Sequence, residues 1–314
     1  INLDDANIQA TLHNRNILIT GAAGSIGSEL VRQVAMRNPG GMILVDMAES
    51  PLHDLTMDLR LQFPNLKFVH IIADVRDNTM IEPIFREYRP NIVFHAAAYK
   101  HVPLMEEFPT QAVMANVLGT KNVADLAIKY EVERFVMIST DKAVNPTNVM
   151  GASKRIAEIY VQSLFLKTVQ EKADCTKFIT TRFGNVLGSN GSVVPYFKKQ
   201  IASGGPVTVT HPDIIRYFMT IPEASSLVLE AATLGNGGEI FVFDMGQPVK
   251  IADLARNMIR LAGFIPGKDI EIRYTGLRSG EKLYEELLNQ KEKTIPTSNN
   301  KILVAKVRAY DYNI

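Results

Sequence analysis

The sequence predicts an α/β fold in which a doubly wound parallel sheet is followed by a smaller α/β domain. Three observations predict it. Short apolar runs alternate with longer amphipathic ones through the first 180 residues, three glycines directly follow the first apolar run, and glycine and proline interrupt the pattern after residue 184. Regular alternation of strand and helix implies right-handed crossovers, which produce a parallel sheet with helices on both faces.

The expected elements follow this alternation in order. We expect strands at residues 16–20, 42–46, 67–72, 91–94, 133–140 and 177–182. The helices between them are expected at residues 25–37, 50–61, 78–88, 110–130 and 148–169. A helix at 222–234 and a strand at 239–244 indicate that the chain re-enters the first domain at about 217–246. The first domain is therefore expected at residues 11–184 and the smaller one at residues 185–314.

Composition excludes several classes of protein. Hydrophobic residues make up 46% of the chain and charged residues 21%, which is typical of globular proteins. The formal net charge of +1 gives no long-range field for nucleic acid or anionic lipid. Cys175 is the single cysteine, which excludes an intrachain disulfide and fits a reducing compartment. We expect no metal site, because none of His95, His101 and His211 has a second ligand at helical spacing.

The sequence also bears on location. It contains no apolar run of about 18 residues and does not open with a signal-peptide pattern, so we expect a cytoplasmic protein. The chain begins at Ile1 without an initiator methionine. We therefore also consider a cytoplasmic catalytic domain whose membrane anchor lies outside this chain.

The first strand-to-helix turn is the strongest cofactor signal. Its glycines let the backbone turn tightly and approach a pyrophosphate, and free N–H groups at the start of the helix face the anion. This pattern predicts a Rossmann-like dinucleotide site in the domain of residues 11–184. The residues expected to line it here are Gly21, Ala23, Gly24, Ser25, Ile26 and Gly27.

Asp46, at the end of the second strand, is placed to bind the adenosine ribose hydroxyls. Residues 47–52 contain no lysine or arginine, so a 2′-phosphate would meet an anion without a cationic partner. This favours NAD over NADP. Residues that follow the third and fourth strands fit walls for the adenine and nicotinamide halves: Asp74, Val75, Ala96, Ala97 and Ala98.

Residues 139–154 contain the densest cluster of reactive side chains. Lys154 stands one helical turn after Met150, where a Tyr-x-x-x-Lys pair would supply a phenol to take a proton from a substrate hydroxyl. The thioether of Met150 cannot exchange a proton. Acid and base duty must lie elsewhere, and Thr140, Asp141 and Lys142 are the candidates. The stretch therefore predicts redox chemistry combined with carboxylate and amine chemistry.

Five motifs together resemble a known family. They are the glycine turn, His-Ala-Ala-Ala-Tyr-Lys-His-Val-Pro-Leu-Met-Glu at 95–106, Asn-Val-Leu-Gly-Thr at 116–120, Ser-Thr-Asp-Lys-Ala at 139–143 and Arg-Phe-Gly-Asn-Val-Leu-Gly-Ser-Asn-Gly-Ser at 182–192. The chain resembles extended short-chain dehydrogenases acting on nucleotide sugars, and more narrowly the UDP-N-acetylglucosamine 4,6-dehydratases of bacterial polysaccharide and protein-glycosylation pathways. The similarity runs from about residue 16 to residue 312. Met150 differs from the tyrosine of the soluble members and matches the membrane-anchored members.

The resemblance implies a lyase that uses NAD and a UDP-sugar. The sugar would be oxidised at C4, lose water across C5 and C6, and receive the hydride at C6. By resemblance Asp141 is the acid at C6, Lys142 the base at C5, Thr140 the group that holds the C4 oxygen, and Lys154 the ligand of the nicotinamide ribose. The acceptor of the C4 hydroxyl proton stays open between Asp141, Lys142 and water. The expected substrate contacts in the smaller, substrate-binding domain and its border are Lys100, Asn185, Arg216, Arg278 and Glu281.

Two other functions fit part of the pattern. A UDP-sugar 4-epimerase would share the hydride step, but it does not need the Asp141–Lys142 pair and would require a tyrosine at position 150. A non-catalytic NAD-binding sensor is supported only by the missing tyrosine.

Two of the expected helices also predict an assembly. Helices 110–130 and 148–169 occupy the places where related dehydrogenases pair two subunits through a four-helix bundle. We therefore expect a homodimer or a larger even-numbered homo-oligomer. The second helix carries a row of side chains at helical spacing: Ile156, Ile159, Tyr160, Ser163 and Leu164.

Overall fold

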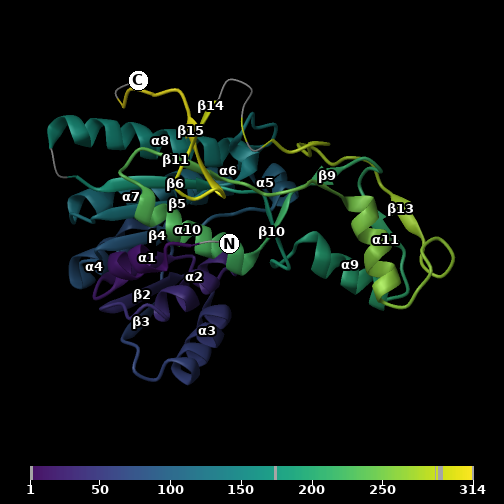
Figure 1. Cartoon of the computed structure of the whole chain (residues 1–314), viewed down its shortest axis with the longest axis horizontal. Coiled ribbons are helices and arrows are strands. Elements are labelled where there is room, and N and C mark those ends of the chain that lie inside the picture. Colours follow the sequence, from purple (N-terminus) through teal and green to yellow (C-terminus); the bar gives the residue numbers. More distant parts are fainter. Residues whose placement is uncertain (1–2, 173–174, 287, 289–292, 313–314) are drawn as a thin grey trace.

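The computed structural model describes residues 3–172, 175–286, 288 and 293–312. A large sheet with helices on both faces forms one part, and a smaller group that includes α9 (Val193–Ala202) and α11 (Ile251–Leu261) extends from it (Figure 1). The expected fold class is confirmed. None of the helices within the described residues is both long and apolar enough to cross a bilayer.

The large sheet has the strand order of a doubly wound fold. In spatial order its strands are β14 (Lys293–Pro296), β15 (Ile302–Lys306), β11 (Ile240–Phe243), β6 (Lys177–Arg182), β5 (Arg134–Ile138), β4 (Ile92–His95), β1 (Asn16–Thr20), β2 (Gly41–Asp46) and β3 (Phe68–Ile72). Neighbouring strands from β11 to β3 are parallel to each other. β15 pairs antiparallel with β11 on one side and with β14 on the other. The order reverses between β1 and β4, which is where such sheets bind ligands.

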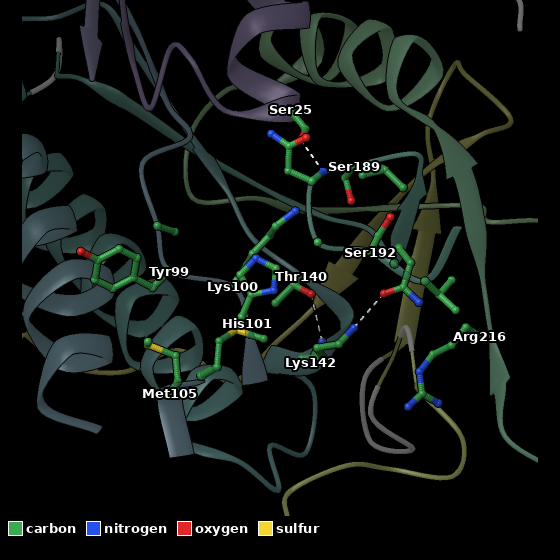
Figure 2. A pocket seen from close by; sticks show the side chains of 18 of the residues that line it. Ser25, Tyr99, Lys100, His101, Met105, Thr140, Lys142, Ser189, Ser192 and Arg216 are labelled. Carbon is green, nitrogen blue, oxygen red and sulfur yellow. Dashed lines mark hydrogen bonds between the residues drawn. The ribbon is translucent and has the colours of Figure 1, made fainter. Parts of the chain in front are cut away.

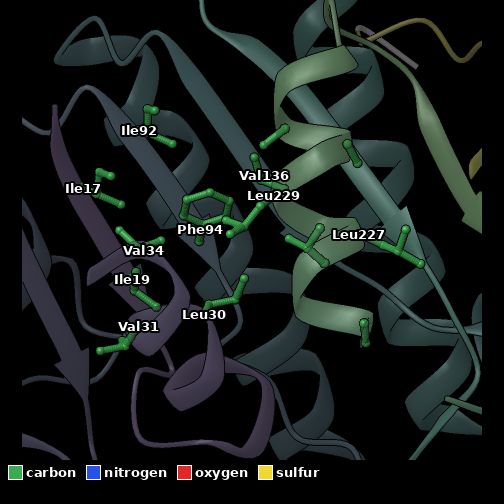
Figure 3. Packing of buried hydrophobic residues seen from close by; sticks show 14 of the residues in the cluster. Ile17, Ile19, Leu30, Val31, Val34, Ile92, Phe94, Val136, Leu227 and Leu229 are labelled. Carbon is green, nitrogen blue, oxygen red and sulfur yellow. The ribbon is translucent and has the colours of Figure 1, made fainter. Parts of the chain in front are cut away.

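Both faces of this sheet are buried, as the near-continuous apolar strands require. On β1, Ile17 and Ile19 pack on one face and Leu18 on the other. Figure 3 shows the first face, where Leu227 and Leu229 lie on a helix that packs against β5 and β6. The helices contributing to this face are α1 (Asp5–Leu12), α2 (Ser25–Ala35), α3 (Glu49–Gln62) and α10 (Ile221–Leu234). Those contributing to the opposite face are α4 (Asn78–Tyr88), α7 (Gly119–Lys129) and α8 (Val149–Glu171).

The helix expected at 110–130 is interrupted. It consists of α6 (Pro109–Ala112), a wider π-helical turn at Val113–Leu118, and α7. The π turn contains the buried Asn116, whose amide accepts from the Tyr99 N–H at 2.8 Å and donates to the Tyr99 carbonyl at 2.9 Å and to Ser153 Oγ at 2.9 Å. Interrupted helices of this kind are frequent at functional sites. Here the interruption fixes the loop after β4 against α8.

The fifth strand ends two residues earlier than the expected range of 133–140. It stops at Ile138, and Asp141–Ala143 form a single 3₁₀ turn capped by the Thr140 hydroxyl. Residues 293–306 also differ from expectation, because β14 and β15 extend the large sheet although the sequence analysis placed them in the smaller domain.

The smaller part is built from short elements around its own apolar cluster. Besides α9 and α11, its surroundings contain β7 (Asn185–Leu187), β8 (Val207–Val209), β9 (Ile215–Arg216), β10 (Phe218–Thr220), β12 (Val249–Lys250) and β13 (Ile272–Tyr274), whereas α5 (Val102–Glu107) packs against α6 and α8. The strands pair as β10 with β7, β12 with β9, and β13 with β8.

A buried ion pair aligns the elements that lead into the site. Arg182 at the end of β6 donates from Nε to Glu158 Oε1 at 2.8 Å and from Nη2 to Glu158 Oε2 at 2.7 Å. Ser139 donates to the same Oε1 at 2.6 Å. Glu158 lies one turn beyond Lys154 on α8, so this network ties α8 to the ends of β5 and β6. Breaking a buried pair of this kind typically costs about 3–5 kcal/mol.

Candidate active site

A cavity of about 1040 Å³ lies between the carboxyl end of the large sheet and the smaller part. Figure 2 shows Lys100, His101, Thr140 and Lys142 converging on it, with Arg216 on its far side. The volume is large enough for a cofactor together with a substrate. The cavity wall contains most of the residues predicted for catalysis and substrate binding: Thr140, Lys142, Met150, Lys154, Lys100, Asn185, Arg216, Arg278 and Glu281.

The glycine turn forms one end of the cavity. Gly21 has φ +66°, and a Cβ built there would lie 2.6 Å from the Ala97 nitrogen. A Cβ on Gly27 would lie 1.9 Å from the Gly21 carbonyl oxygen. Only glycine fits at both places, so the turn packs closely on the loop after β4. Gly24 is the N-cap of α2 and, as a glycine, has no side chain to cap it, which leaves N–H groups of the first turn available to an anion.

Several predicted cofactor residues lie behind or beside this wall. Gly21, Gly24, Ser25, Ile26, Gly27, Ala96 and Ala98 line the cavity, whereas Ala23, Asp46, Asp74, Val75 and Ala97 are outside its lining. Asp46 stands at the end of β2 and accepts hydrogen bonds from the Ala23 and Ala48 N–H groups, both at 2.9 Å. The hydrogen bond from Ala23 means that the glycine turn itself orients the carboxylate of Asp46. Asp74 is paired with Arg76 at 2.5 Å, and that hydrogen bond outweighs burial and lowers the pKa of Asp74.

Lys142 is the cation at the centre of the site. Its Nζ donates to Asp141 Oδ1 at 3.0 Å and to Asn185 Oδ1 at 3.2 Å, and lies 3.7 Å from Glu285 Oε1. Burial favours the neutral amine, but the carboxylates of Asp141 and Glu285 outweigh it, so the pKa of Lys142 is raised above its ordinary value. The resting side chain is therefore an ammonium group.

Asp141 lies beneath the cavity rather than in its wall. It is fully buried, and its Oδ1 accepts from the Thr140 hydroxyl at 2.8 Å as well as from Lys142. Its Oδ2 is buried, and no residue in the described part of the chain forms a hydrogen bond with it. Thr140 and Lys142, which donate to Asp141, both line the cavity and so connect this carboxylate to it.

Met150 and Lys154 line the cavity from the first turns of α8. Burial lowers the pKa of Lys154 to about 8, against the opposing effect of the Glu158 carboxylate. The phenol of Tyr99 also lines the cavity, but its hydroxyl points to Met47 Sδ at 3.9 Å, beside Asp46. It therefore does not replace the phenol that position 150 lacks.

Arg216 reaches the cavity from β9 and is held in a fixed orientation. Its Nη1 donates to the Ile215 carbonyl at 2.7 Å and its Nη2 to the Lys282 carbonyl at 2.8 Å. Glu281 lies 3.5 Å away and also accepts from the Arg278 N–H at 3.1 Å. Arg278 and Lys100 also line the cavity, and this fixed guanidinium together with them suits an anionic group such as a phosphate.

The histidines have different roles. His95 is buried between the Thr20 hydroxyl at 2.8 Å and the Thr120 hydroxyl at 3.0 Å, and burial lowers its pKa to about 3. It is a packing residue. His101 lines the cavity, and burial followed by the charge of Lys100 lowers its pKa. His211 accepts from the Asp213 N–H at 3.1 Å within a loop.

Sequence reasoning missed three residues that shape the site. Asn116 fixes the Tyr99 backbone, and Glu285 faces Lys142. Ser192, at the start of α9, has a buried hydroxyl that forms no hydrogen bond within the residues that the structure describes. Two of them lie within or beside motifs recognised in the sequence. Their roles depend on side chains brought together from distant segments, which no local spacing shows.

Comparisons with known proteins agree with this architecture. Residues 17–307 match the profile of the family described as "Polysaccharide biosynthesis protein". The capsular polysaccharide biosynthesis protein CapD of Staphylococcus aureus is 55% identical over 99% of this chain and 51% of its own length. The probable polysaccharide biosynthesis protein EpsC of Bacillus subtilis is 51% identical over 93% of this chain and 48% of its own length. The chain thus spans about half the length of these two relatives.

Further matches carry the names of nucleotide-sugar enzymes. A UDP-glucose 4-epimerase of Rickettsia rickettsii is 35% identical over 89% of this chain and 79% of its own length. Among solved structures, Pen from Bacillus thuringiensis matches with a TM-score of 0.86 and 31% identity, covering 96% of this chain and 90% of that one. The dTDP-glucose 4,6-dehydratase DesIV of Streptomyces venezuelae, solved with NAD, shares the fold with a TM-score of 0.74 and 22% identity, covering 88% of both chains.

Proposed function

The chain belongs to the polysaccharide biosynthesis protein family of extended short-chain dehydrogenases, and from this we propose that it is an NAD-dependent UDP-sugar 4,6-dehydratase. The observation that carries the proposal is the Lys142–Asp141 pair at the cavity, because an elimination needs a base and an acid side by side. UDP-N-acetylglucosamine is the proposed substrate. It would enter the cavity with its diphosphate toward Arg216 and Arg278 and its sugar toward Thr140 and Lys142.

The cofactor site fits NAD. Gly21 and Gly27 leave room for the pyrophosphate, the uncapped start of α2 faces it, and Asp46 is oriented toward the adenosine ribose. Lys154 would hold the nicotinamide ribose. When bound, NAD supplies the hydride acceptor for C4 oxidation and the hydride that returns to C6.

The chain's own residues would divide the elimination between them. Moving one proton along the 3.0 Å hydrogen bond from Lys142 to Asp141 gives a neutral amine and a carboxylic acid. The amine of Lys142 then takes the C5 proton. Asp141 delivers its proton to the leaving C6 hydroxyl through the hydroxyl of Thr140, and water departs. Lys142 returns its proton to C5 as C6 receives the hydride, and the C4 hydroxyl proton, released to water, restores the charge of the pair.

A mass-spectrometric assay with UDP-N-acetylglucosamine and NAD tests this proposal. A product lighter by one water is expected. A new sugar isomer of unchanged mass would instead establish a UDP-sugar 4-epimerase, the second candidate, which the 35% identity to an enzyme of that name supports. No conversion would leave a non-catalytic NAD-binding sensor.

Replacing Asp46 by alanine should reduce the preference for NAD over NADP. The carboxylate is expected to bind ribose hydroxyls and to repel a 2′-phosphate, so NAD affinity should fall about 10- to 100-fold while NADP affinity falls less. Calorimetric titration of both dinucleotides measures the two constants. Asp58→Ala, which removes a half-exposed carboxylate from α3, is the control. Equal affinities in the unaltered protein would contradict the assignment.

We also propose that the chain forms a homodimer or a larger even-numbered assembly through α7 and α8. Ile156 is 50% exposed on α8, whereas Tyr160 is already hydrogen-bonded to Asp125 and packs near the ring of Tyr312. Light scattering should show at least a dimer at about micromolar concentration, and Ile156→Asp should shift it toward monomer. A monomeric unaltered chain would show that these faces pack only internally.

A further inference from the structure

Glu285 is a buried carboxylate that faces Lys142 from the segment before β14. Its Oε1 lies 3.7 Å from Lys142 Nζ and 3.8 Å from Arg216 Nε, so one oxygen contacts two cations. Its Oε2 is buried and has no hydrogen-bond partner among the described residues. Burying a carboxylate that has only these two ion-pair contacts among the described residues costs folding free energy, which indicates a role other than stability.

We propose that Glu285 is a positioning residue that holds the Lys142 ammonium against Asp141 and separates it from the guanidinium of Arg216. The inference rests on the proposed role of Lys142 as the base at C5. It assigns to the segment after Arg278 a function in the elimination as well as in binding.

The charges around Lys142 support this role. Asp141 faces the ammonium from its own turn, Glu285 from the segment of residues 281–286, and Arg216 from β9. Arg216 is a like charge and opposes protonation of Lys142. Farther out, Glu281 lies beside Arg216, and Lys282 and Glu286 pair with each other at 3.2 Å. Glu285 is therefore the carboxylate shared by the two central cations.

The backbone keeps both partners in place when Glu285 is changed. Tyr284 forms a β-bridge with Ile215, which fixes this segment beside β9. Arg216 retains its hydrogen bonds to the carbonyl groups of Ile215 and Lys282. Glu285→Gln should therefore remove a charge from the site without moving Arg216.

Titration of Lys142 tests the proposal directly. In the full chain with its lysines labelled with ¹³C, the Cε signal of Lys142, assigned from Lys142→Met, should titrate at a lower pH in Glu285→Gln by about one to two units. Glu286→Gln, the matched control at the next residue, should leave that titration unchanged. Arg216→Gln should move it in the opposite direction, because a like charge is removed. Glu285→Asp keeps the charge on a shorter side chain, so the pKa of Lys142 in this variant should lie between its values in Glu285→Gln and in the unaltered protein.

Catalysis gives a second measurement. The dehydration rate should fall at high pH, where the Lys142–Asp141 pair loses its last proton. In Glu285→Gln this fall should occur at lower pH, while KM for the UDP-sugar should not rise. If the pKa of Lys142 is the same in Glu285→Gln as in the unaltered protein, the proposal is overturned. If Glu285→Gln does not fold, an unchanged pKa of Lys142 in Arg216→Gln would overturn it. Because this titration needs no turnover, a protein without dehydratase activity would refute the proposed function and still decide the role of Glu285.

Discussion

Lys142→Met should abolish water loss while leaving the first hydride transfer intact. Methionine preserves the length of the side chain but cannot accept a proton, so the C5 proton has no acceptor. We expect dehydration and exchange of the C5 hydrogen with solvent deuterium to fall together by about 100- to 10,000-fold, the usual contribution of a general base. The sugar should still reduce NAD, which can be measured by absorbance in a single-turnover experiment.

The variant also leaves Asp141 and Glu285 buried without their shared cation, so its folding must be measured separately. A melting temperature and an NAD affinity near those of the unaltered protein would assign the loss to chemistry. Lys129→Met is the control, because Lys129 is an ion-paired lysine at the far end of α7. Dehydration that survives in Lys142→Met would show that the base lies elsewhere, and the epimerase or sensor function would then regain support.

The fold was predictable because its signals are local. Runs such as those of β1, β2 and β4 are buried on both faces, which produces continuous apolar strands, and the glycine turn needs a backbone that a Cβ would block. The edge strands escaped prediction for the opposite reason. All four residues of β14 are exposed, so its sequence has no apolar alternation, and it is placed only by pairing with β15.

The site was predictable in its membership but not in its geometry. The spacing of Thr140, Asp141 and Lys142 identified the reactive cluster, yet it could not show that Asp141 lies beneath the wall while its two neighbours line it. The π-helical turn around Asn116 lies inside a range for which the sequence predicted one continuous helix, because the wider turn is defined by its backbone hydrogen bonds. Glu285 meets Arg216 because β9 and the segment of residues 281–286 lie side by side, and it meets Lys142 from a segment that is distant in the sequence.

Asp141→Asn should separate the two halves of the elimination. The amide has nearly the shape of the carboxylate but cannot supply a proton to the departing C6 hydroxyl. Removing the negative charge also releases more of the neutral amine at Lys142, because Asp141 raises the pKa of that lysine. We therefore expect exchange of the C5 hydrogen to be retained, while dehydration falls about 100- to 10,000-fold.

Thr140→Val is the companion variant, because it keeps Asp141 but removes the hydroxyl through which the proton is proposed to pass. It should resemble Asp141→Asn, with C5 exchange retained and dehydration reduced. Deuterium incorporation at C5 and product formation, both read from the same mass spectrum, measure the two steps in each variant. If Asp141→Asn lost C5 exchange along with dehydration, Asp141 would instead act before the elimination, as the acceptor of the C4 hydroxyl proton. If Thr140→Val alone dehydrated normally, the proton of Asp141 would have to reach C6 by another path, and Lys142 is the remaining side chain between Asp141 and the cavity.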